Sequence, residues 1–153
     1  MSTRLVIGIG NPSRGDDAIG PRFIERLQAL DLPGVECLTD FQLQVEHVLD
    51  LHGRAAIVFV DAAASGPSPF AFTHIAAMAD ASVSSHALSP PALLAAYRQH
   101  YAAPAPVSHV LAIRGHAFEL GAGLSPAAAA NLDAGFRFLL AWLDGKVSPA
   151  ATS

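Results

Sequence analysis

Short runs of apolar residues, rich in Val and Ile, alternate along the chain with segments in which apolar residues recur at helical spacing. The runs that predict strands are RLVIGIG, VECLT, AAIVFV, PFAFTHI and VSHVLAIRG, and the fourth is typical of a shorter edge strand. Strands that alternate with helices favour βαβ units on a mostly parallel sheet.

Four segments predict helices. In the first, apolar residues from Ile19 to Leu30 follow a near-helical spacing, and because Pro21 is tolerated only in the first turn, this helix should begin close to Asp17. The second segment places four residues on one face: Leu43, His47, Val48 and Leu51. The third is SPPALLAAYRQHY, which opens with a serine cap and a proline. The fourth is SPAAAANLDAGFRFLLAWLDG, which should turn inward Leu132, Phe136, Leu139, Leu140 and Leu143.

These elements predict one domain over residues 1–153 with a three-layer, doubly wound α/β fold. Its five-stranded, mostly parallel sheet should carry helices on both faces. Residues 77–88 are expected to form a loop and residues 146–153 a loose tail.

Composition narrows the possible partners. Apolar residues make up 52% of the 153 positions and charged residues only 14%, as in a well-buried globular protein. A net charge of -4 with 9 Lys and Arg residues leaves no basic surface for nucleic acid or an anionic membrane. With no signal segment and no stretch that could span a bilayer, we expect a cytoplasmic monomer. Cys37 is the single cysteine of the chain, so no internal disulfide can form. We expect its side chain to serve as a small buried apolar group.

Acidic residues follow three of the predicted strands. Asp16 and Asp17 lie after the first strand, Asp40 ends the second and Asp61 ends the third. Ligands of open α/β sheets bind outside the carboxyl ends of the strands, so these four side chains should converge on one edge. A single aspartate in such a position is more often a helix cap or a strand end than a catalytic group.

Two other classes of protein carry part of this pattern. A dinucleotide-binding domain would explain the glycines after the first strand, but they read G-x-G-x-x-x-x-G, and two carboxylates occupy the helix start that should attract phosphate. A phospho-receiver signalling module would explain Asp16, Asp17 and Asp61. Such a module also needs a lysine at the end of its last main strand, where this chain has Arg114.

The third possibility is a metal site, for which a histidine would supply the third ligand. Two carboxylates and one imidazole at one sheet edge are a plausible three-ligand set with open coordination positions. Of 7 histidines, His86 is best placed, because it lies in the polar loop SVSSHALSPP that should pass over this edge. We therefore expect Asp17, Asp61 and His86 to form the site, and the other histidines to be structural or solvated.

Four stretches in the same order resemble the hydrogenase maturation endopeptidases, peptidase family M52: GNPSRGDDAIG, VDAAASG, SSHALSP and GLSP. The resemblance covers nearly the whole chain. It implies a protease that removes the C-terminal extension of a nickel-iron hydrogenase large-subunit precursor once nickel has been inserted. The metal-contacting and catalytic residues that it implies are Asp17, Asp61 and His86. Supporting roles fall on Asp16, Asp40, Gly10 and Asn11.

The resemblance also implies a mechanism in which nickel arrives with the substrate. The enzyme's carboxylates and imidazole would complete the coordination of a metal that thiolates of the precursor already hold. The metal would polarise the scissile carbonyl or lower the pKa of a bound water, and Asp17 or Asp61 would accept a proton. This metal-dependent aspartate/histidine site needs no Ser, Cys or Thr nucleophile. After Asp40 the chain reads DFQLQVEHVLDL, without the glycines usual in the family, so details of substrate recognition do not carry over.

Overall fold

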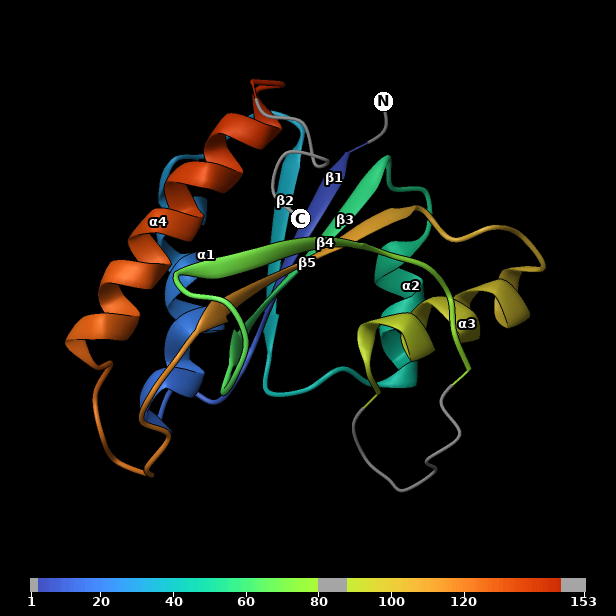
Figure 1. Ribbon diagram of the computed structural model, residues 1–153. Coiled ribbons are helices and arrows are strands. Elements are labelled where there is room, and N and C mark those ends of the chain that lie inside the picture. The colour runs from blue at the N-terminus through green and yellow to red at the C-terminus, as the bar shows by residue number, and fades with distance from the viewer. Residues whose placement is uncertain (1–2, 80–87, 147–153) are drawn as a thin grey trace.

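The computed structural model describes residues 3–79 and 88–146, which form a three-layer α/β fold (Figure 1). The strands are β1 (Arg4–Ile9), β2 (Val35–Asp40), β3 (Ala56–Ala63), β4 (Phe70–Ile75) and β5 (Val107–Arg114). The helices are α1 (Ile19–Ala29), α2 (Val48–Leu51), α3 (Pro90–Tyr101) and α4 (Pro126–Leu143). The 3₁₀ turns η1 (Gly15–Ala18) and η2 (Val45–His47) lead into α1 and α2.

The sheet has the order β2-β1-β3-β5-β4, in which β4 is antiparallel to β5 and every other pair is parallel. The predictions of a mostly parallel five-stranded sheet and of an edge strand over PFAFTHI are therefore confirmed. From β1 the chain moves outward to β2 and then returns to β3 on the other side of β1. The strand order thus reverses between β1 and β3, and such a switch point is where open α/β sheets bind their ligands.

Helices cover both faces of the sheet (Figure 1). On one face, Val6 and Val58 pack with α1 and α4, whose Phe23 and Phe136 rings meet edge to face at 5.2 Å. On the other face, residues such as Ile7 pack with α2 and α3. Successive strand residues point to opposite faces, and both faces are buried, so the central strands are continuous apolar runs in the sequence.

Two elements differ in length from their predictions. The second helix begins only at η2, because Gln44 is extended and its side chain forms a capping box with His47, and so Leu43 precedes the helix although it is buried. Strand β3 continues two residues beyond Asp61, because Ala62 and Ala63 still pair with β5. Asp61 therefore lies within β3, close to its carboxyl end, rather than after the strand.

The third and fourth helices match the sequence more closely. Ser89 and Ser125 are their N-caps, and each hydroxyl accepts a hydrogen bond from the backbone three residues later. All but one of the residues expected to face inward on α4 are buried; Leu140 is half-buried. Among residues 3–79 and 88–146, no helix combines the length and hydrophobicity that a bilayer span requires.

Candidate functional site

Asp17 is held at the carboxyl end of β1 by the turn that follows the strand. The backbone N–H of Asn11 donates a 2.7 Å hydrogen bond to Oδ2 of Asp17. Gly10 has a φ of 148°, and a Cβ at this position would overlap the carbonyl oxygen of Asp17. Glycine is therefore required for η1 to lie against the end of β1. The turn places the half-buried Asp17 carboxylate at the switch point between β1 and β3.

Asp61 occupies the other side of the same switch point, near the end of β3. Its Oδ1 accepts a 2.8 Å hydrogen bond from the N–H of Ala62. Burial raises the pKa of Asp61 to about 7, and the negative charge of Asp17 adds to this rise, while the hydrogen bond from Ala62 opposes it. The carboxylates of Asp17 and Asp61 therefore repel each other at this edge. A cation bound between them would relieve the repulsion.

Asp16 points the other way, into the protein. Its carboxylate has no exposed surface and accepts four hydrogen bonds: from the N–H groups of His116, Ala117 and Ser125 and from the Ser125 hydroxyl, at 2.7 to 2.9 Å. Burial raises the pKa of Asp16, but these bonds together outweigh burial and hold the pKa below its ordinary value. The expectation that Asp16 shares the ligand-binding edge is thus wrong, because its full set of donors lies in the β5–α4 connection.

Asp40 lies at the rim of the edge rather than with Asp17 and Asp61. Its Oδ1 accepts a 2.7 Å hydrogen bond from the N–H of Phe41, and its Oδ2 lies 3.3 Å from Nε2 of His47. Its carbonyl oxygen accepts a 3.0 Å hydrogen bond from the N–H of Gly10. Asp40 therefore braces the loop after β2 against the turn after β1.

The predicted site is only partly within the described residues. The structure brings Asp17 and Asp61 to one place, whereas His86 lies outside the residues that it describes. Within residues 3–79 and 88–146, no three His, Cys, Asp or Glu side chains are grouped so that they could hold a metal ion. The residue to which sequence reasoning gave no role is Ser125, the partner of Asp16, although it lies in the GLSP motif before the proline that starts α4.

The residues that the alternative functions would use have other roles. Arg114 stands where a receiver module has its lysine, but its guanidinium donates to the carbonyl oxygens of Gly66 at 2.9 Å and Gly115 at 3.2 Å. It ties two loops together. Asp16 and Asp17 occupy the helix start at which a dinucleotide's phosphates would bind, and a buried carboxylate there disfavours an anion.

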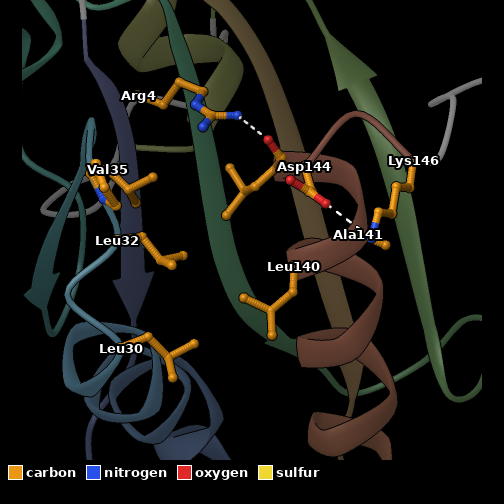
Figure 2. A pocket seen from close by; sticks show the side chains of 10 residues that line it. Arg4, Leu30, Leu32, Val35, Leu140, Ala141, Asp144 and Lys146 are labelled. Atoms are coloured by element: carbon orange, nitrogen blue, oxygen red, sulfur yellow. Dashed lines mark hydrogen bonds and ion pairs between the residues drawn. The ribbon is translucent and has the colours of Figure 1, made fainter.

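A mostly apolar hollow of about 550 Å³ lies away from this site (Figure 2). It lies between the segment from α1 to β2 and the end of α4. Arg4, which begins β1, lines one side and donates a 2.7 Å hydrogen bond to the carbonyl of Leu143. Leu30, Leu32 and Leu140 line its wall. Because Arg4 and Val35 begin their strands, the hollow belongs to the amino ends of the sheet, opposite to the two acids.

Comparison with known proteins gave matches at the level of structure. No protein-family model matches the sequence, and no curated protein matches it. Among solved structures, the chain superposes on the hydrogenase maturating endopeptidase HybD of E. coli with a TM-score of 0.72, at 23% identity over 94% of this chain and 93% of that one. A [NiFe] hydrogenase maturation protease HycI from Thermococcus kodakarensis gives 0.71, at 22% identity over 90% of each chain.

A third solved structure covers almost the whole of both chains. It is an endopeptidase from Escherichia coli, with a TM-score of 0.71 at 25% identity over 99% of each chain. The three-layer arrangement that the pattern of strands and helices predicted is the arrangement of these proteins. The chain therefore has the fold of the hydrogenase maturation proteases, the family that its four motifs resemble.

Proposed function

We propose that the protein is an endopeptidase that removes the C-terminal extension of a nickel-iron hydrogenase large-subunit precursor after nickel insertion. The observation that carries this proposal is the placement of Asp17 and Asp61 on the two sides of the β1/β3 switch point, in a fold that proteases of this kind share. The four sequence motifs support the same function.

In the proposed reaction the precursor brings its own nickel to the enzyme. Asp17, Asp61 and His86 would contribute oxygen and imidazole ligands to the metal that the precursor's thiolates hold. The repulsion between Asp17 and Asp61 favours a cation at this place. Two carboxylates and one imidazole without a thiolate form a weak site for a free transition metal, so recognition would depend on the loaded substrate.

The chemical step is hydrolysis of one peptide bond. A water molecule adds to the scissile carbonyl carbon while one of the two carboxylates accepts its proton, and the C–N bond breaks as a proton passes to the leaving amine. The substrate's metal would polarise the carbonyl or acidify the water. Cys37 takes no part, because it is partly buried in β2 and burial raises the pKa of its thiol.

The test compares nickel-loaded and nickel-free forms of one large-subunit precursor. The enzyme is first stripped of metal with a chelator, and the mass of the precursor's C-terminus is followed over time. We expect cleavage of the loaded form alone. Comparable cleavage of the nickel-free form, or a requirement for zinc added to the stripped enzyme, would replace this proposal with an ordinary metallopeptidase.

Variants test which residues act. Asp17→Asn, Asp61→Asn and His86→Ala should each abolish cleavage of the loaded precursor, whereas Cys37→Ser should retain it. Circular dichroism of each variant controls for folding. Near-wild-type processing by any two of the first three variants would remove them from the site, and loss of processing by a folded Cys37→Ser protein would favour a cysteine peptidase.

A further inference from the structure

A small hollow of about 260 Å³ adjoins the acidic edge on the side of β2. Its walls come from the turn after β1, the first turn of α1 and the end of β2. The lining residues are Gly10, Pro12, Pro21, Thr39, Asp40 and Phe41. Two proline rings and one aromatic ring make most of this wall apolar. The lining contains no cationic side chain.

The hollow and the two acids share one structural element. Gly10 lines the hollow, binds the carbonyl of Asp40 through its N–H, and packs against the backbone of Asp17. The next residue, Asn11, holds the Asp17 carboxylate. An extended peptide presented to Asp17 and Asp61 therefore needs to run only a few residues toward β2 to reach the hollow.

The loop that carries Phe41 is braced in the free protein. Nδ1 of His47 accepts a 2.9 Å hydrogen bond from the N–H of Gln44, and Nε2 of the same ring lies 3.3 Å from Oδ2 of Asp40. With the bond from Phe41, both carboxylate oxygens of Asp40 are occupied. The hollow is therefore preformed, and little ordering is needed when a ligand enters it.

Phe41 leaves 64% of its surface exposed, although aromatic side chains gain most from burial. Aromatic residues that are exposed beside a preformed hollow often become buried when a partner binds. Because Gly10 both lines the hollow and packs against the backbone of Asp17, the occupant that fits best is the chain presented to Asp17 and Asp61.

We propose that Phe41 and this hollow form a side-chain subsite that receives an uncharged, apolar side chain of the precursor close to the scissile bond. The inference rests on the proposed function and adds a determinant of substrate choice to it. An acidic side chain is disfavoured there by Asp40 and by the absence of a cation from the lining. The subsite also gives a role to the loop after Asp40, in which the family's usual glycines are missing.

The first experiment measures steady-state cleavage of the nickel-loaded precursor by Phe41→Ala and Phe41→Leu enzymes. We expect Phe41→Ala to raise KM about tenfold with kcat within about twofold, and Phe41→Leu to restore most of the loss. Val107→Ala is the matched control, because Val107 is 55% exposed but begins β5 at the opposite edge. It should leave both constants unchanged.

The second experiment changes the substrate. Each residue within four positions of the cleaved bond is replaced in turn by Ala and by Asp. At one apolar position, we expect both replacements to raise KM for the wild-type enzyme. The Ala replacement should have little further effect on Phe41→Ala, which is the coupling that direct contact produces, whereas the Asp replacement should still raise KM because Asp40 remains in the lining. Independent effects at every position would overturn the subsite.

The outcomes separate this inference from the function on which it rests. If wild-type enzyme fails to cut the loaded precursor, the proposed function fails and the subsite fails with it. If wild-type enzyme cuts and Phe41→Ala has an unchanged KM, or loses only kcat, the subsite alone is wrong. If Phe41→Ala instead turns a dimer into a monomer by light scattering with kcat/KM unchanged, the surface is a contact between copies of this chain.

Discussion

Asp16 and Asp17 are adjacent and chemically identical, but their surroundings are opposite. Asp16 is buried and accepts hydrogen bonds from a segment about 100 residues later in the chain, as the separation of 109 positions to Ser125 illustrates. Asp17 is half-buried and held by a local bond from Asn11. The first aspartate therefore fastens η1 to the start of α4, and this leaves the second at the edge of the sheet.

Asp16→Asn should lower the free energy of unfolding by about 2 to 3 kcal/mol, because an amide NH₂ would face donors that now bind a carboxylate oxygen. The protein that remains folded should still process precursor. Urea unfolding measures the first effect, and activity per folded molecule the second. Asp31→Asn, on an exposed turn with a φ of 47° that Asn tolerates, is the control and should unfold like wild type. An unchanged unfolding midpoint for Asp16→Asn would show that its four bonds contribute no net stability.

At the scale of elements, the closeness of α1 to β1 decides where Asp17 lies. A Cβ on Gly8 would overlap the carbonyl oxygen of Gly20, and one on Gly20 would overlap that of Ile9. The helix is thus seated directly on the strand, and η1 has to turn within a few residues. Gly8 is a strand residue whose missing side chain permits this close packing.

Gly10→Ala should displace η1 and break the bond between Asn11 and Asp17, since its Cβ would meet the Asp17 backbone at a φ that favours glycine. We expect stability to fall by about 3 kcal/mol and processing to be lost even in the folded fraction. Thermal unfolding and the precursor assay measure the two effects. Gly123→Ala is the matched control, because a Cβ at Gly123 would meet no atom within 4 Å. Wild-type activity in Gly10→Ala would mean that this turn does not position Asp17.

At the scale of the whole molecule, the free energy of unfolding depends on pH through Asp61 and His109, which have opposite effects. The pKa of Asp61 rises from 3.8 to about 7 in the fold, so between these values the folded chain holds a proton that the unfolded chain has released, and stability falls as pH rises. Burial and the neighbouring His74 lower the pKa of His109 below 6.5. Below about pH 6.5, His109 therefore gains its proton more readily in the unfolded chain than in the folded one. The free energy of unfolding falls as pH falls through this range.

Asp61→Asn removes the first contribution and should stabilise the metal-free protein while abolishing processing. We expect a melting temperature about 5 °C above wild type at pH 8, where Asp61 is ionised, and a smaller difference at pH 5, where it holds its proton. Comparison at the same pH cancels the contribution of His109. A melting temperature at or below that of wild type at pH 8 would contradict the proposed electrostatic cost of Asp61.

The sequence alone determined what depends on local pattern. Periodicity predicted the strands and the fold class, because a strand buried on both faces is a continuous apolar run and a packed helix repeats its apolar face every few residues. The order of motifs placed Asp17 after β1 and Asp61 near the end of β3. For His86 the sequence remains the only source, since it lies outside the described residues.

Only the tertiary structure decided which acids lie together. The Asp16 side chain points away from the edge because its hydrogen-bond donors lie on a connection 100 to 109 positions away, and no local pattern encodes such a partner. The braced loop of Asp40 and His47, and the hollow beneath Phe41, likewise depend on how β2 meets the turn after β1. Local sequence sets where an element runs, whereas the direction and charge state of a side chain follow from what packing brings beside it.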